Sequence, residues 1–356
     1  MIERIIIENY KSIRRLDLPL QPINILIGAN GAGKSNFISF FQLVNRLYEG
    51  TGREYTEEKG ANSLLYRGVK HSNYLKGLLD FNNVNAYEFS LAARNDESMY
   101  LRNQYDYYNH ANDHSKNYTT WNRKTTDSPY RDGVTYRNQY IKIHLSSFRV
   151  YHFHDTSDQS AMKRINQVDD NRYLKEDASN LASFLYLLQE RFPKHFRQIE
   201  MTVQSIAPFF EKFDLRPRAL QPDQIKLEWK EKGSDMYLDA HNLSDGTLRF
   251  IALTTLLMQP EPPETIIIDE PELGLHPVAI NKLAGLLYKA SHQCQVIVGT
   301  QSVGLVNNFS PDCIITVDRK DEQSVFERLH EEKLHNWLED FSLGELWNKK
   351  VIGGQP

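Results

Sequence analysis

Residues 28–35 of the chain read Gly28-Ala29-Asn30-Gly31-Ala32-Gly33-Lys34-Ser35. This stretch fits the phosphate-binding pattern G-x-x-x-x-G-K-[ST] at every specified position. The β-branched apolar run before it, residues 23–27, predicts a buried strand, and the unbroken run over residues 36–44 predicts a helix. A strand, a glycine-rich loop and a helix in this order are the context that the pattern requires, so a chance glycine-rich turn is the weaker interpretation.

The residue types of this loop suit a bound polyphosphate. Its glycines allow backbone conformations that are closed to other residues and let the backbone approach phosphate groups closely. Successive backbone N–H groups then point into one concavity at the positive end of the following helix. Lys34 supplies a cation for the β- and γ-phosphates, and the hydroxyl of Ser35 is a hard oxygen ligand suited to Mg²⁺. We therefore expect a nucleotide site formed by Gly28, Asn30, Gly31, Ala32, Gly33, Lys34, Ser35 and Asn36.

A second glycine-bearing helix start follows much later in the chain. Ser244 and Gly246 precede an apolar run over residues 248–258 that predicts a helix. A hydroxyl and free backbone N–H groups at this point can bind an anion, or they can simply cap the helix.

Two further strands end in polar side chains. The apolar run at 265–268 leads into Asp269 and Glu270, and the run at 295–300 leads into Gln301. Asp269 suits holding Mg²⁺ near Ser35, and Glu270 suits polarising an attacking water. Because ligand groups collect at the carboxyl ends of the strands in an open parallel sheet, Gln301 is expected to sense the γ-phosphate or to be an ordinary polar strand end.

The middle of the chain predicts an insertion and a helical subdomain. Residues 49–70 are polar and predict a loop, and residues 78–93 alternate as strands do. Residues 95–139 interleave tyrosine and asparagine with few aliphatics, which favours a surface insertion, although aromatics among arginines also suit stacking on nucleic-acid bases. Residues 140–145 predict a returning strand, and the apolar spacing over 176–215 predicts helices.

Three histidines lie near the end of that returning segment: His144, His152 and His154. A metal site formed by them is the weaker interpretation, because Asp155 is the only close acid and no cysteine is near. Polar residues that line the nucleotide edge, or satisfied core histidines, are the better ones.

Composition bounds the classes of protein. Charged residues at 25% and hydrophobic residues at 40% are typical of a globular protein, and the 356 residues can form one large domain or two. The net charge of −4 argues against a generally basic nucleic-acid binder but not against a local basic patch. Cys294 and Cys313 lie in apolar runs and favour buried thiols over a disulfide. With no signal peptide and no apolar run of ~18–20 residues, we expect a cytoplasmic protein without a membrane partner.

In this order, these elements resemble the ABC-type ATPases of the RecF/SMC/OLD group, most closely the stand-alone AAA family ATPases of AAA_21 type. The resemblance rests on five stretches and on the C-terminal tail 343–356: Ile7–Ile13 (IENYKSI), the phosphate loop, Leu243–Arg249 (LSDGTLR), Ile268–Pro277 (IDEPELGLHP) and Thr300–Ser302 (TQS). It implies an α/β P-loop NTPase fold of ABC-ATPase type, with a mixed sheet flanked by helices, a helical subdomain and a polar insertion. The expected division is a first ATPase lobe (1–94), the insertion (95–139), a return to the lobe (140–172) and the helical subdomain (173–222). A last part (223–356) holds the signature helix, the strand that ends in Asp269 and Glu270 (Walker B), the switch strand that ends in Gln301, and the C-terminal tail.

The resemblance also implies a mechanism. Members form a head-to-tail dimer that encloses two ATP molecules with Mg²⁺, so that Ser244 and Gly246 of one copy complete the γ-phosphate site of the other. Glu270 and Lys34 are then catalytic, with Ser35 and Asp269 as the metal residues. The switch position, a histidine in many relatives, is Gln301 in this chain, which implies slow or regulated hydrolysis.

Three functions compete on this basis. The first is a dimeric ATP-driven clamp or sensor that regulates a separate effector, such as a nuclease, in anti-phage defence, with DNA or RNA as a further candidate partner. The second is a RecF-like DNA-binding ATPase in repair or chromosome maintenance. A transporter subunit is the weakest interpretation, because residues 243–247 lack the Gly-Gly-Gln form of the transporter motif.

Overall fold

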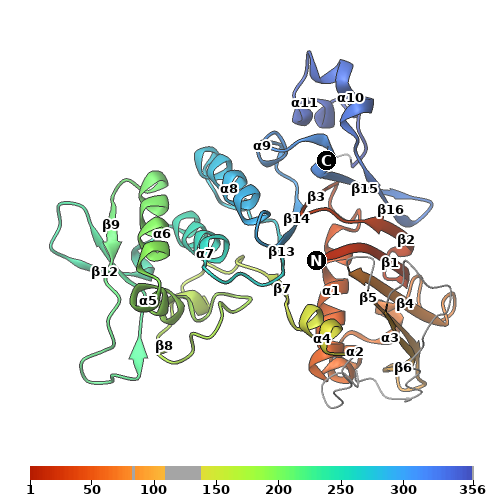
Figure 1. The fold of residues 1–356 in the computed structure, drawn as a ribbon, viewed down its shortest axis with the longest axis horizontal. Helices are drawn as coiled ribbons and strands as arrows, with labels where there is room; N and C mark the ends of the chain where they lie inside the picture. Colours follow the sequence, from red (N-terminus) through yellow and green to blue (C-terminus); the bar gives the residue numbers. More distant parts are fainter. Residues whose placement is uncertain (82–84, 109–137, 355–356) are drawn as a thin grey trace.

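The computed structural model describes residues 1–81, 85–108 and 138–354, and two sheets organise it (Figure 1). The larger sheet has six strands in the order β16-β15-β3-β14-β13-β7. All neighbours pair in parallel except β15 and β16. Its strands are β3 (Ile23–Ile27), β7 (Phe148–Tyr151), β13 (Thr265–Asp269), β14 (Gln295–Thr300), β15 (Ile314–Lys320) and β16 (Gln323–Arg328).

The second sheet has five antiparallel strands in the order β2-β1-β4-β5-β6. They are β1 (Ile2–Tyr10), β2 (Ile13–Pro19), β4 (Tyr74–Phe81), β5 (Asn85–Ala93) and β6 (Met99–Tyr108).

Helix α1 (Lys34–Glu49) fills the space between the two sheets. Its aromatic side chains pack on both of them, Phe40 stacking on Phe89 of β5 at 5.8 Å and Phe41 meeting Phe148 of β7 edge-on at 6.0 Å between ring centroids. Gly77 of β4 makes this packing possible, since a Cβ there would lie 2.5 Å from the Phe40 ring. The core therefore fixes the helix that follows the phosphate loop against both sheets.

The other face of the six-stranded sheet is covered by helices α7 (Asp245–Met258) and α8 (Pro277–Ala290). Strands buried on both faces must be apolar throughout, as Ile266–Ile268 and Val296–Val298 are. Figure 1 shows α5, α6, β9 and β12 on the side of the molecule away from β1 and β2. The elements between β7 and α7 include α5 (Leu181–Arg191), α6 (Pro193–Ile206), β8 (Asn166–Gln167), β9 (Phe210–Phe213), β10 (Gln224–Ile225), β11 (Glu228–Glu231) and β12 (Tyr237–Asp239). The C-terminal part adds α9 (Val303–Val306), α10 (Glu331–Leu338) and α11 (Leu343–Asn348).

Three local predictions are wrong. Residues 49–70 are not a loop but contain α2 (Gly52–Lys59) and α3 (Ala61–Leu64). The start of the predicted insertion is strand β6, whose Met99 and Leu101 are buried; residues 109–137 lie outside the described residues.

The third error concerns residues 140–145, which belong to helix α4 (Asn138–Ser146) and not to a strand. Ile141 and Leu145, four residues apart, are buried, whereas Ile143 is 51% exposed. Apolar residues at every second position fit a strand equally well, and the packing of α4 on β5 and α1 decides for the helix.

Candidate active site

The predicted phosphate loop connects β3 to α1, as its pattern requires. Gly31 and Gly33 have φ of 78° and 126°, a region that favours glycine. A Cβ on Gly33 would overlap Ser324 of β16, and one on Gly28 would overlap the Val317 carbonyl of β15. Helix α1 has no side-chain cap, so its first N–H groups are available to an anion.

The side chain of Lys34 folds back onto the phosphate loop. Its side chain is almost buried, at 4% exposed, and its ammonium donates to the carbonyls of Gly28 and Ala29. Burial lowers the pKa of Lys34, and the nearby carboxylates of Asp269 and Glu270 act in the opposite direction. Of the residues that the structure describes, Gly28 and Ala29 alone accept from this ammonium, through their carbonyls, which leaves it suited to a phosphate partner.

Ser35 and Asp269 are in contact at the carboxyl end of β13 in the six-stranded sheet. The Ser35 hydroxyl donates to Asp269 Oδ2 at 2.9 Å, while Oδ1 of the same carboxylate is buried and has no hydrogen-bond partner among the described residues. Burial raises the pKa of Asp269, and the bond from Ser35 opposes that shift. A hydroxyl and a carboxylate with one free buried oxygen are hard ligands that fit Mg²⁺.

Glu270 and Gln301 lie side by side at the ends of β13 and β14. The Gln301 amide donates to the Glu270 carboxylate. Glu270 has a φ of 45°, unusual for a residue with a Cβ, and its backbone N–H donates to Gly299 at 2.7 Å. Backbone strain of this kind is concentrated at functional sites.

Glu272 is a member of this group that sequence reasoning missed. Its Oε1 accepts from the Thr300 hydroxyl at 2.5 Å and from the Gln301 backbone N–H at 3.1 Å. Its Oε2 is buried, and no residue in the described ranges donates to it. Burial raises the pKa of Glu272. The side chain thus ties the segment after β13 to the strand end that carries Gln301.

The loop also has supporting contacts that no local pattern predicts. The Asn36 amide donates to Ser12 Oγ at 2.7 Å, and Ser12 and Ser324 join their hydroxyls at 2.7 Å. Ser324 also donates to the Ala32 carbonyl at 2.5 Å. A cavity of about 440 Å³ opens beside these residues and continues to Tyr66 and Arg67.

Two of the three histidines lie near Asp269, at the carboxyl ends of the strands of the six-stranded sheet. His154 Nε2 lies 3.1 Å from the Asp269 carbonyl, and His152 Nε2 lies 2.7 Å from Gln42 Nε2 of α1. His144 is elsewhere, against Glu264. In the described part of the chain, no group of three His, Cys, Asp or Glu side chains is placed to hold a metal ion.

The signature residues lie apart from the phosphate loop. Ser244 caps α7, its Oγ accepting from the Thr247 N–H at 3.2 Å. A Cβ on Gly246 would lie 2.5 Å from the Gly274 carbonyl, so two backbones are in close contact there. Both residues line a cavity of about 370 Å³ with Gly274–His276, and no phosphate-loop residue is among those lining it.

Arg249 connects α7 to the segments that follow β7 and β13. The buried guanidinium donates to the carbonyls of Phe153 at 2.8 Å, His154 at 2.9 Å and Leu273. One side chain therefore holds the start of α7, the segment after β7 and the segment after β13 together.

A bilayer-spanning helix is absent from residues 1–81, 85–108 and 138–354.

The chain is similar in sequence to known proteins. The model of a family described as "AAA domain, putative AbiEii toxin, Type IV TA system" matches residues 23–307. The chain is 24% identical over 376 aligned residues to an OLD nuclease of Thermus scotoductus, covering 97% of this chain and 68% of that protein. Over 82 residues it is 35% identical to the energy-coupling factor transporter ATP-binding protein EcfA of Methanocaldococcus jannaschii, 22% of this chain and 28% of that one.

Among solved structures, the fold is similar to two SMC heads. One is the Smc head bound to the C-winged helix domain of ScpA, with a TM-score of 0.64, 15% identity, and coverage of 94% of this chain and 99% of the other. The second is a Pyrococcus furiosus Smc head with an extended coiled coil, with a TM-score of 0.57, 16% identity, and coverage of 95% and 98%. The chain belongs to the AAA-domain family whose model it matches over residues 23–307, and it is an ABC-type, ATP-binding ATPase of the RecF/SMC/OLD group.

Proposed function

We propose that the chain works as an ATP-driven head-to-tail dimer in which each ATP is enclosed by the phosphate loop of one copy and by Ser244 and Gly246 of the other. One observation carries this proposal. The start of α7, with Ser244 and Gly246, opens on its own cavity, which no phosphate-loop residue of the same chain lines. A hydroxyl and backbone N–H groups placed in this way suit a phosphate that another molecule brings.

The first half of each site is formed within one chain. Backbone N–H groups of residues 28–36 hold the phosphates, and Lys34 leaves its carbonyl partners to neutralise the β- and γ-phosphates. Ser35 and Asp269 would hold Mg²⁺, which supplies charge neutralisation at the phosphate oxygens when bound.

Glu270 is the residue that acts on the attacking water. Its carboxylate orients a water molecule and accepts its proton as the new bond to the γ-phosphorus forms and the bond to the ADP oxygen breaks, giving ADP and phosphate. Gln301 donates to one oxygen of this carboxylate and leaves the other for water. Because an amide cannot take over a proton as a histidine can, we expect slow turnover that a partner accelerates.

The closing and opening of this dimer would regulate a separate effector, such as a nuclease, in anti-phage defence. The relationship to a protein named OLD nuclease and to a family named for a toxin system supports this role. It is a proposal from relatedness, since the same ATPase fold serves many functions.

A RecF-like role on DNA is the second candidate, and one surface favours it. On the five-stranded sheet, the guanidinium of Arg102 lies 5.7 Å from the Tyr74 ring and that of Arg94 lies 5.8 Å from the Tyr100 ring. Aromatic and arginine side chains on a sheet suit stacking with nucleic-acid bases. ATP turnover stimulated by DNA alone, without a protein partner, would favour this role.

The test compares wild type with Glu270→Gln. We expect slow hydrolysis by wild type, and a fall of about 10²–10⁴-fold for the variant because the general base is lost. With ATP and Mg²⁺, light scattering should show Glu270→Gln accumulating as a dimer or a multiple of it.

The matched control is Glu190→Gln, an exposed residue of α5, which should hydrolyse ATP as wild type does. Normal hydrolysis by Glu270→Gln, with no change of mass on adding ATP to either protein, contradicts the two-site dimer.

A further inference from the structure

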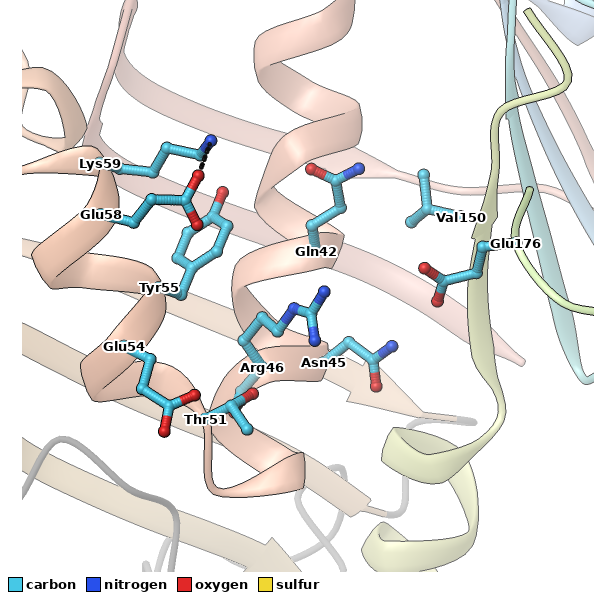
Figure 2. Close-up of a pocket in the computed structure, with 10 residues that line it drawn as sticks. All are labelled: Gln42, Asn45, Arg46, Thr51, Glu54, Tyr55, Glu58, Lys59, Val150 and Glu176. Carbon is cyan, nitrogen blue, oxygen red and sulfur yellow. Dashed lines mark hydrogen bonds and ion pairs between the residues drawn. The ribbon is translucent and has the colours of Figure 1, made fainter. Parts of the chain in front are cut away.

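A polar cavity lies between α1, α2 and the segment after β7, beside the far part of the phosphate-loop helix. Its volume of about 390 Å³ is in the range of small-molecule sites. Figure 2 shows Glu54, Glu58 and Lys59 on the α2 side, Glu176 on the opposite wall, and residues of α1 between them. The lining residues are Gln42, Asn45, Arg46, Thr51, Glu54, Tyr55, Glu58, Lys59, Val150 and Glu176.

Within the described part of the chain, two side chains of this cavity have acceptors without a hydrogen-bond partner. Asn45 is 7% exposed, and its Oδ1 is buried and accepts no hydrogen bond from a residue that the structure describes. Figure 2 shows its side chain extending from α1 toward Glu176. Glu176 also lines the cavity, and no ion pair or side-chain hydrogen bond with another described residue engages its carboxylate. Burial raises the pKa of Glu176, and the charges of Arg149 and Arg46 oppose that shift.

The positive groups of the cavity differ in how well they are paired. Lys59 contacts Glu58 at 2.7 Å, so these two charges cancel locally (Figure 2). Among the residues that the structure describes, Arg46 has one ion pair, with Glu49 at 3.6 Å, and most of its donors remain for another acceptor. Counting Arg46 and Lys59 against Glu54, Glu58 and Glu176, the lining has two positive and three negative side chains, a formal charge of −1.

These groups favour one class of ligand over a metal ion. In the part of the chain that the structure describes, no three carboxylates or histidines are close enough to share a metal. A ligand that matches them needs donors toward Asn45 and Glu176, an acceptor toward Arg46, and a second cationic group toward Glu54. A basic amino acid has this set of charges, with a net charge of +1 against the −1 of the cavity.

We propose that this cavity binds a free basic amino acid such as L-arginine or L-lysine. Its α-ammonium donates to Asn45 Oδ1 and the Glu176 carboxylate, and its α-carboxylate accepts from Arg46. The side-chain cation faces Glu54. The site is also connected to the segment after β7. Gln42 on its wall contacts His152 of that segment, and the His152 backbone N–H donates to the Glu176 carbonyl at 2.9 Å.

Calorimetry on the full chain without nucleotide tests the site independently of the proposed dimer. L-Arginine and L-lysine should bind with Kd below about 1 mM. Agmatine, which lacks the α-carboxylate, should bind more weakly, and L-glutamate should not bind. Glu176→Gln should weaken L-arginine binding by about 10- to 100-fold, the usual worth of a hydrogen bond to a charged group.

The matched control is Glu57→Gln on the same helix α2. Glu57 pairs with Arg53 at 2.7 Å and does not line the cavity, so this variant should bind L-arginine as wild type does. Thermal unfolding of both variants verifies that they fold. Absence of heat with L-arginine and L-lysine at ~10 mM overturns the proposal. Equal weakening by Glu57→Gln and Glu176→Gln, or equal binding of L-glutamate and L-arginine, also overturns it.

Discussion

Helices α1 and α7 both begin at a glycine-bearing turn that suits an anion, yet their first turns differ. Helix α1 begins after Gly33 with no side-chain cap, and a lysine folds over the loop in front of it. Helix α7 is capped by its own Ser244 and packs a glycine backbone against Gly274. The first helix start leaves its N–H groups for a ligand, whereas the second already satisfies one of them internally.

From this difference we expect the start of α1 to serve nucleotide binding and the start of α7 to serve dimer formation. The loop before α1 has a cation, a hydroxyl and a carboxylate within its own chain, so one copy has the groups needed to bind a nucleotide. The start of α7 has only a hydroxyl and backbone donors, and Arg249 ties it to the segments that follow β7 and β13 through three carbonyls. We therefore expect substitutions at the two places to affect different steps.

The largest effect should come from Gly33→Ala. A Cβ there would overlap Ser324, and the backbone φ of 126° is unfavourable for alanine. Each of these costs is of order 1–3 kcal/mol, so together they predict ATP binding weaker by ~100-fold or more. Equilibrium binding of a fluorescent ATP analogue to the isolated chain measures it.

Gly31→Ala is the matched control in the same loop. Its φ is also positive, at 78°, but a Cβ would meet no atom within 4 Å, so binding should fall by only about 10-fold. If Gly33→Ala binds ATP as well as Gly31→Ala does, the contact of the loop with β16 is not what positions it.

The loop and its supports also show what a sequence can predict. The phosphate loop, the Asp269–Glu270 strand end and Gln301 were predictable because a local pattern places each at the end of a buried strand. Ser324 was not, because it reaches Ala32 from a strand about 290 residues later. Residues 140–145 failed for a different reason, since alternate isoleucines fit both a strand and α4 and only tertiary packing distinguishes them.

An intermediate effect is expected from Ser244→Ala. Loss of the hydroxyl removes the bond from the Thr247 N–H and costs about 1 kcal/mol of helix stability. If Ser244 also completes the site of a second copy, turnover should fall by about 10- to 100-fold, while ATP binding to one chain changes little. Steady-state hydrolysis and analogue binding, measured on the same preparation, distinguish the two.

Ser342→Ala removes a comparable cap, because Ser342 accepts from the Glu345 N–H at the start of α11. It should lose a similar amount of stability and keep full turnover. Equal turnover in the two serine variants would mean that Ser244 is a helix cap only.

The smallest effect concerns Glu272, the buried carboxyl group that ties the segment after β13 to the end of β14. Burial raises the pKa of Glu272 above its value in the unfolded chain, about 4.3. Between these two values the folded chain holds a proton that the unfolded chain has released, so rising pH removes stability until the folded pKa is passed. Glu272→Gln keeps an oxygen for Thr300 and Gln301 but does not titrate. The melting temperature of Glu272→Gln minus that of wild type should therefore rise by about 1–3 °C from pH 5 to pH 8. The same difference for Glu190→Gln should stay level. If the difference for Glu272→Gln falls with pH, the charged form of Glu272 is the one that the fold stabilises.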